Sequence, residues 1–142
     1  MRALLDVNVL IALLDGGHIH HSAANEWLAA HIGEGWASCP LTQNGCLRIM
    51  SADAYPRAKP VATVAERLKE ATATRFHEFW PDEISVLDSS KFQESRWLSS
   101  RQITDAYLLA LAVHRDGTFV TLDRKVDLGL VLHAEPRHLV TI

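Results

Sequence analysis

The feature that most constrains the fold is residues 2–14, in which two apolar runs meet with only one aspartate between them. Ala3 to Leu5 is short and continuously apolar, which is typical of a strand buried on both faces. Apolar residues then recur at helical spacing, so we expect a helix to start near Val7. Asp6 therefore lies at the carboxyl end of a buried strand, the edge of an α/β sheet where ligands bind. The alternative is that Asp6 only caps the helix.

Composition limits the class of protein. A chain of 142 residues with 48% hydrophobic residues fits one domain over residues 1–142 with a sizeable core. Two cysteines form neither a disulfide framework nor a zinc pattern, which indicates a reducing, cytoplasmic location. Asp6 interrupts the first apolar run, and no run approaches the roughly 20 apolar residues of a membrane span. A net charge of −3 argues against binding nucleic acid by bulk charge, although a nuclease with an acidic metal site is compatible with it.

The remaining chain predicts an alternation of strands and helices. Strands are expected at 36–39, 84–87 and 118–122, with candidate edge strands at 130–132 and 139–141. Helices are expected at 22–32, 42–50, 61–72, 74–80 and 104–114, with a loop at 51–60 and a helical turn at 92–98. This alternation is typical of βαβ units, so we expect an α/β fold with a mostly parallel sheet.

Two further aspartates are predicted to lie at the same edge as Asp6. Thr104 is a good amino-terminal cap, which would place Asp105 in the first turn of a buried helix. Asp123 follows a predicted strand in the way that Asp6 follows residues 3–5. Each aspartate alone could be a cap or turn residue, but three carboxylates in one small volume repel one another unless a cation is bound. Oxygen ligands suit Mg²⁺ or Mn²⁺ rather than zinc, and such an ion can activate water for displacement at phosphorus.

Three segments resemble the signature segments of the PIN-domain ribonucleases, in particular the VapC toxins of bacterial toxin–antitoxin pairs. They are residues 5–10, 104–106 and 120–124, and the resemblance extends over essentially the whole chain. It implies a compact three-layer α/β/α sandwich and an Mg²⁺- or Mn²⁺-dependent endoribonuclease that cuts structured RNA. The family's catalytic metal ligands correspond to Asp6, Asp105 and Asp123. Asn8 would orient Asp6 or its helix turn, and Thr121 would support the site.

The resemblance also implies a homodimer that is neutralised by a small VapB-type antitoxin inserted into the active-site groove. The chain departs from the family at the start of the third helix, where Gln43 occupies the position of a common Glu. Asp127 would compensate if its turn folds inward, and otherwise is a surface turn residue. Arg124 is the best candidate for an RNA phosphate contact. Trp80, beside a proline, is a candidate for a dimer or antitoxin surface.

Two other functions deserve comparison. A binding protein with the PIN fold but without catalysis is favoured by Gln43 and opposed by the intact trio Asp6, Asp105 and Asp123. A phosphatase of the haloacid-dehalogenase kind is suggested by the spacing of Asp6 and Asn8. However, an asparagine cannot act as the general acid there, and the chain has no cap domain. Metal-dependent RNA cleavage would separate the ribonuclease from both.

Overall fold

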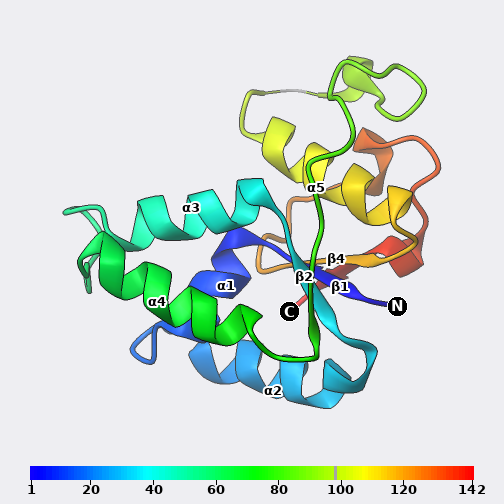
Figure 1. The fold of residues 1–142 in the computed structure, drawn as a ribbon. Coiled ribbons are helices and arrows are strands. Elements are labelled where there is room, and N and C mark those ends of the chain that lie inside the picture. Colours follow the sequence, from blue (N-terminus) through cyan, green and yellow to red (C-terminus); the bar gives the residue numbers. More distant parts are fainter. Residues whose placement is uncertain (98) are drawn as a thin grey trace.

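The computed structural model describes residues 1–97 and 99–142, and its centre is a five-stranded parallel sheet (Figure 1). The strands are β1 (Ala3–Leu5), β2 (Trp36–Ser38), β3 (His77–Phe79), β4 (Thr118–Thr121) and β5 (Leu139–Thr141). Their order is β3-β2-β1-β4-β5, and each neighbouring pair is parallel. From β1 the chain adds β2 and β3 on one side and then β4 and β5 on the other, so the strand order reverses between β1 and β4. A ligand site is expected at this point, at the carboxyl ends of β1 and β4.

Helices cover both faces of the sheet. They are α1 (Val7–Leu14), α2 (His21–His31), α3 (Pro40–Met50), α4 (Val61–Thr72) and α5 (Gln102–His114). Short 3-10 helices occupy Ile32–Glu34, Glu94–Arg96, Leu128–Leu130 and Pro136–His138. One face packs its side chains on α5, and the other packs on α1 to α4. The predicted three-layer α/β/α sandwich is therefore confirmed.

The predictions for residues 74–80 and 84–87 were wrong, because the third strand lies earlier than expected. Residues 77–79, predicted as part of a helix, pair in parallel with 36–38 and form β3. This pairing satisfies backbone groups that a helix of only seven residues would leave without partners. Residues 84–87, predicted as a strand, form a turn, and Leu87 is 84% exposed. The segment runs past α5 without joining the sheet (Figure 1).

Other boundaries differ less. Helix α3 begins at Pro40 rather than Thr42, since proline suits the first helical position. Helix α5 begins at Gln102, so Thr104 lies inside the first turn and is not the cap. The edge strand at 139–141 is confirmed, whereas 130–132 makes only an isolated bridge between Val131 and Phe92. In the stretch 92–98, the helical turn is present at 94–96, and residue 98 lies outside the described residues.

The loop between α3 and α4 is fastened to the end of α1. Asp15 is 7% exposed, and its carboxylate accepts a hydrogen bond from the Tyr55 hydroxyl. Arg57 Nε donates to both Asp15 oxygens, at 2.8 Å to Oδ1 and 2.7 Å to Oδ2. Burial acts to raise the Asp15 pKa, but the hydrogen bonds from Tyr55 and Arg57 outweigh it and lower the pKa to about 2. The carboxylate is therefore charged at any ordinary pH, and the loop is held by a charge-assisted network.

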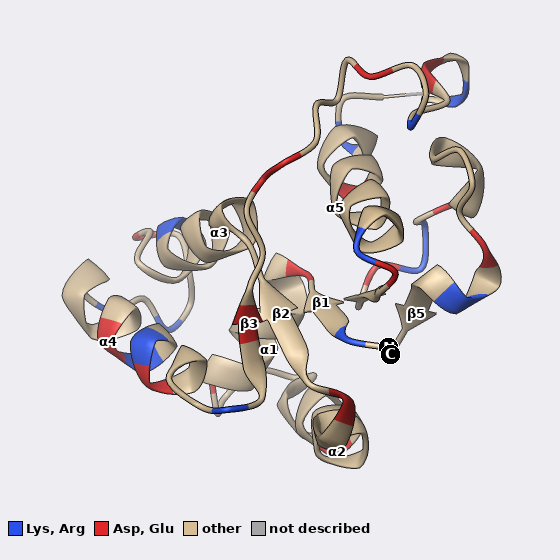
Figure 2. Ribbon diagram, turned by 45° about the vertical axis from the view of Figure 1, so that its right-hand side comes forward, with Lys and Arg blue, Asp and Glu red and all other residues tan. Residues whose placement is uncertain are grey.

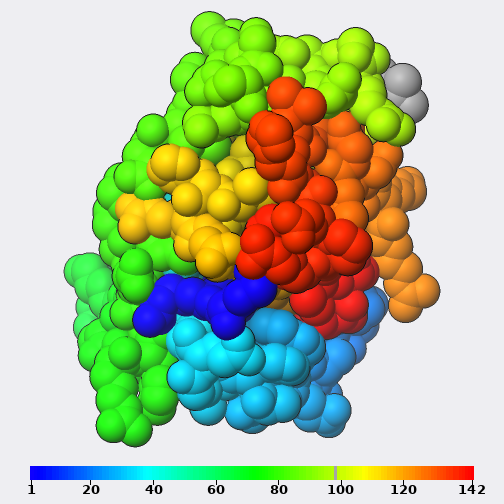
Figure 3. Space-filling view, turned by 90° about the vertical axis from the view of Figure 1, so that its right-hand side faces the viewer, coloured from blue at the N-terminus to red at the C-terminus, as the bar shows by residue number. Residues whose placement is uncertain are grey.

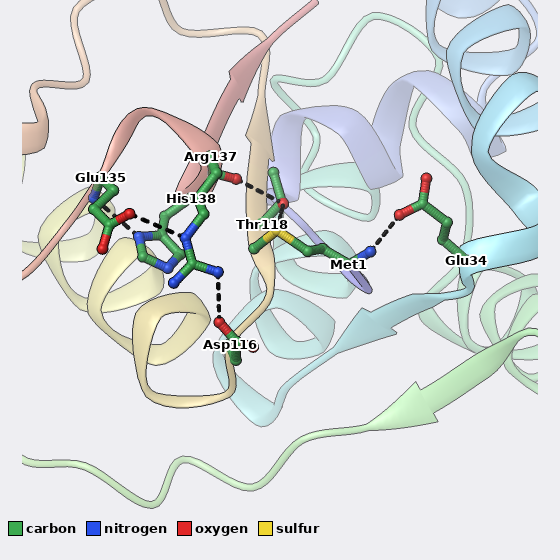
Figure 4. Close-up of polar contacts among 7 residues, drawn as sticks. All are labelled: Met1, Glu34, Asp116, Thr118, Glu135, Arg137 and His138. Atoms are coloured by element: carbon green, nitrogen blue, oxygen red, sulfur yellow. Dashed lines mark hydrogen bonds and ion pairs between the residues drawn. The ribbon is translucent and has the colours of Figure 1, made fainter.

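The amino edge of the sheet is closed by polar contacts (Figure 4). The Met1 ammonium binds Glu34, and the Thr118 hydroxyl donates to the Arg137 carbonyl at 2.9 Å. Arg137 also pairs with Asp116 at 2.8 Å. In Figure 3 the first residues lie between the α5 segment, the turn after α2 and the C-terminal strand. This edge is opposite to the one at which Asp6 follows β1.

The burial of side chains and the distribution of charge bear on several expectations from the sequence. Trp80 is only 2% exposed, so our prediction of a surface role was wrong; its ring packs in the core and Nε1 donates to Glu78. Both cysteines are free, and both are buried. Lys, Arg, Asp and Glu are interspersed along the chain, and none of the labelled elements is wholly basic (Figure 2). Among the described residues, no helix has the length and apolar character needed to cross a membrane.

Candidate metal and catalytic site

Asp6 is held by hydrogen bonds to both of its carboxylate oxygens. It follows β1 and caps α1, with Oδ1 accepting the Val7 amide at 2.7 Å. Oδ2 accepts the Thr121 hydroxyl at 2.6 Å, and Asp6 is only 6% exposed. Burial raises the pKa of Asp6, the two hydrogen bonds work against this, and the nearby Asp123 charge adds to it. The side chain is thus oriented by the fold and is costly to keep charged.

Thr121 and Asn8 connect the ends of β1 and β4. The Asn8 amide donates to Thr121 Oγ1 at 3.2 Å, while Asn8 Oδ1 accepts the Leu122 amide at 3.1 Å. Thr121 Oγ1 also accepts the Asp123 backbone amide at 3.0 Å. The one hydroxyl therefore contacts Asp6, Asn8 and the backbone of Asp123, which fixes the two strand ends relative to each other.

Asp105 faces Asp6 and Asp123 from the first turn of α5. Burial, then the charge of Asp6, then that of Asp123, raises the pKa of Asp105 to about 6. No hydrogen bond in the described part of the chain reaches its carboxylate. Asp123 is half-buried and accepts the Lys125 amide at 2.8 Å. The three aspartates predicted to converge are thus close enough to influence one another.

The donor set fits a hard divalent cation. The available groups are carboxylate oxygens, and the repulsion felt by Asp105 is what a bound cation would relieve. Across residues 1–97 and 99–142, no three His, Cys, Asp or Glu side chains close into a preformed metal cage. Mg²⁺ does not need such a cage, because it takes one or two carboxylates and keeps several of its waters. The residues present therefore fit Mg²⁺ or Mn²⁺ better than zinc.

Gln43 lies in a network that the sequence did not suggest. Its Nε2 donates to Ser38 Oγ at 2.9 Å, and Ser38 Oγ lies 2.8 Å from His77 Nε2. The network joins α3 to β2 and β3. Gln43 takes the position of a Glu that is common in the family, but no hydrogen bond between described residues links it to Asp6 or Asp105. His77 was missed because residues 74–80 were assigned to a helix, and Ser38 was missed because its partner His77 was.

The last two candidate residues lie on the surface. Asp127 does not fold into the cluster; its Oδ1 accepts the Gly129 amide at 2.8 Å and caps the 3-10 helix that follows. Arg124 is exposed beside Asp123, and in the described chain no hydrogen bond or ion pair holds its guanidinium. Arg124 is thus next to Asp123 in the chain, whereas Asp127 has the role of a turn residue.

Comparison with known proteins identifies relatives over the whole chain. The PIN domain family model matches residues 3–128. Ribonuclease VapC44 of Mycobacterium tuberculosis is 51% identical over 142 residues, covering all of both chains. Ribonuclease VapC39 of the same organism is 38% identical over 124 residues, covering 87% of this chain and 89% of that one.

Solved structures show the same fold at low sequence identity. One neighbour is a chain in the crystal structure of VapBC2 from Rickettsia felis bound to a DNA fragment from their promoter, with a TM-score of 0.59 and 12% identity. The match covers 88% of this chain and 90% of that chain. Mycobacterium tuberculosis VapC20, described as a sarcin-ricin loop cleaving toxin, matches with a TM-score of 0.56 and 13% identity, over 82% and 85% of the two chains.

Proposed function

The chain belongs to the VapC ribonucleases of the PIN-domain family, and we propose that it is an Mg²⁺- or Mn²⁺-dependent endoribonuclease acting as the toxin of a toxin–antitoxin pair. We further propose that residues 1–142 act as one domain, in the cytoplasm. The observation that supports this best is the convergence of Asp6, Asp105 and Asp123 at the carboxyl edge of the sheet. Catalytic carboxylates that repel one another are what a cation-dependent site requires.

Each residue has a distinct part in the proposed chemistry. Bound Mg²⁺ supplies a Lewis acid and a water of lowered pKa. Asp6 is the anchored ligand, since Val7 and Thr121 fix both of its oxygens. Asp105 is the adjustable ligand, because no hydrogen bond among the described residues restrains it. Thr121 and Asn8 are positioning residues that hold the ends of β1 and β4 at constant spacing.

The proposed products follow from the choice of nucleophile. If water attacks phosphorus and the ribose 2′-hydroxyl takes no part, the fragments carry a 5′-phosphate and a 3′-hydroxyl. Arg124, exposed beside Asp123, is placed to contact a phosphate flanking the scissile bond. We propose a structured RNA as substrate, in keeping with the sarcin-ricin loop named for VapC20.

A protein partner is part of the same proposal. The neighbour from Rickettsia felis is named as a VapBC2 structure, and we propose that a VapB-type antitoxin likewise binds this chain. We also propose a homodimer, as the family resemblance implies. The antitoxin must be removed before activity is assayed, because bound antitoxin would hide it.

The test is cleavage of a labelled structured RNA by wild type, Asp6→Asn and the matched surface variant Asp53→Asn. Each protein is assayed with Mg²⁺, with Mn²⁺ and with EDTA. We expect wild type and Asp53→Asn to cut only with metal, and Asp6→Asn to be inactive under all conditions. If folded, antitoxin-free wild type cuts no RNA with either metal, the proposed ribonuclease activity is refuted. The better account would then be a binding protein with the PIN fold, in which Gln43 has replaced an acidic metal ligand.

A further inference from the structure

A chain of hydrogen bonds joins the end of α4 to the first turn of α3. Gln43 Nε2 lies 2.9 Å from Ser38 Oγ, and Ser38 Oγ lies 2.8 Å from His77 Nε2. The His77 ring also makes a hydrogen bond to the Thr72 backbone. We call this series, from Thr72 through His77 and Ser38 to Gln43, the relay. Its members come from α4, β3, β2 and α3, so the relay depends on the fold rather than on one segment.

The direction of each hydrogen bond follows from the donors and acceptors that are present. The bond to the Thr72 backbone raises the pKa of His77, as expected when a ring N–H donates to a carbonyl. Because Nε2 faces Ser38, this donor is Nδ1–H, and Nε2 of the neutral ring is an acceptor. The single proton of the Ser38 hydroxyl is then donated to His77. Ser38 Oγ can only accept from its other partner, which agrees with the Gln43 nitrogen lying against it.

The surroundings of His77 favour its neutral form. Burial lowers its pKa, the Thr72 hydrogen bond raises it, the Arg2 charge lowers it and the Glu78 charge raises it. Arg2 and Glu78 are paired with each other at 2.9 Å, and the Trp36 ring covers His77 at 4.5 Å between centroids. The net result is a pKa below the usual value of about 6.5, so the ring is neutral at neutral pH.

The relay decides which end of the Gln43 amide is turned away from Ser38. The Gln43 side chain is half-buried, and within the described part of the chain no hydrogen bond reaches its Oε1. Gln43 and Thr72, the two ends of the relay, both line a cavity of about 420 Å³ between α3 and α4. A molecule in this cavity would therefore meet the residue whose amide the relay orients.

We propose that Ser38 and His77 form a proton-sensitive switch for the Gln43 amide, which turns its oxygen away from Ser38 when His77 is neutral and its nitrogen away when His77 is protonated. In the protonated ring both nitrogens donate, so Nε2–H donates to Ser38 Oγ. The Ser38 proton is released from that bond and is donated to the Gln43 side chain. Rotation of the terminal amide brings Oε1 to the place of Nε2. One proton is taken up from solvent, and no covalent bond between heavy atoms changes.

The relay also gives a physical reason for an amide at position 43. A carboxylate there has no proton to donate, so it would compete with His77 Nε2 for the one proton of Ser38. One of the two acceptors would be left without a donor until His77 takes up a second proton. Gln43→Glu should therefore favour the charged ring, through Ser38 as well as through the added charge.

The first test follows the relay in wild type by NMR, without RNA or metal, from about pH 8 to about pH 4.5. His77→Phe identifies the ring signals among the eight histidines. We expect ¹⁵N shifts that report Nδ1–H and an unprotonated Nε2 at neutral pH. As His77 takes up its proton, below about pH 6.5, the NOE contacts of the Gln43 amide protons with Ser38 should disappear.

Two serine variants control this measurement. Ser38→Ala removes the hydroxyl that joins the two side chains, so the Gln43 amide signals should no longer follow the titration of His77. Ser51→Ala removes a hydroxyl at the other end of α3, which donates to the Leu47 carbonyl at 2.7 Å and has no part in the relay. In Ser51→Ala the Gln43 signals should follow His77 as in wild type.

The second test compares Gln43→Glu with Asn44→Asp, which add the same charge at adjacent positions, the second of them exposed. Gln43→Glu should raise the midpoint of the His77 titration by about one pH unit or more, and Asn44→Asp by less than about half of that. This comparison does not need Ser38→Ala to fold.

Three results would overturn the proposal. They are a neutral His77 with its proton on Nε2, amide contacts between Gln43 and Ser38 that persist through the titration, and equal shifts in Gln43→Glu and Asn44→Asp. None of these measurements uses RNA cleavage, so the switch and the proposed ribonuclease function stand or fall separately.

Discussion

Replacing Thr121 with valine tests whether one buried hydroxyl organises the site. The substitution keeps the shape of the side chain, which is 0% exposed, and removes the donor to Asp6 Oδ2 at 2.6 Å. A hydrogen bond to a buried carboxylate contributes about 1.5–3 kcal/mol. The Asn8 amide and the Asp123 backbone amide also lose their acceptor, while the added methyl group returns about 0.8 kcal/mol. We expect a net loss of about 2 kcal/mol in the free energy of unfolding.

Thr118→Val is the matched control, because it lies on the same strand and is nearly as buried. Its hydroxyl donates to the Arg137 carbonyl at 2.9 Å, a neutral bond at the opposite end of β4 (Figure 4). We expect Thr118→Val to lower the free energy of unfolding by less than about 1 kcal/mol. Urea unfolding in EDTA measures both variants, and the difference corresponds to roughly 4 °C in Tm per kcal/mol for a chain of this size. Equal losses, or full RNA cleavage by Thr121→Val, would show that the hydroxyl does not organise Asp6.

Two further predictions concern stability. The pKa of Asp15 is lowered to about 2 in the folded protein, so its charge stabilises the fold. This contribution to the free energy of unfolding should be complete above about pH 4 and disappear as the pH falls toward 2. Asp15→Asn should therefore lower the free energy of unfolding by about 2 kcal/mol near pH 6 and by little near pH 2. Urea unfolding across this pH range measures the loss, and a loss that does not change with pH would contradict the prediction. Gly45→Ala would place a Cβ 2.8 Å from Val7 Cγ2 and should cost about 1–3 kcal/mol, whereas Gly33→Ala, with nothing within 4 Å, should not. Thermal unfolding compares these two variants, and equal Tm values would refute the packing argument.

The acidic cluster was predictable from the sequence because it depends on strand ends, not on side-chain detail. Asp6 and Asp123 each follow a short buried apolar run, and parallel strands bring such residues to one edge. Asp105 required only that a buried helix start near that edge. These inferences tolerate errors of a few residues, such as the earlier start of α5 at Gln102.

The features that the sequence did not predict depend on partners distant in the chain. Residues 77–79 form a strand only because 36–38 is available to pair with them, so the network of Gln43, Ser38 and His77 could not be foreseen.

The Thr121 hydroxyl has a consequence for the timing of activity during synthesis. It joins Asp6 and Asn8 to the backbone of Asp123, so groups more than 110 residues apart must meet before the site exists. The pairing of β1 with β4 is likewise non-local, and such contacts form late in folding. A ribosome that has made only the first hundred residues therefore carries a chain that lacks Thr121 and Asp123, in which this arrangement cannot form. The site is complete only when nearly the whole chain has been made.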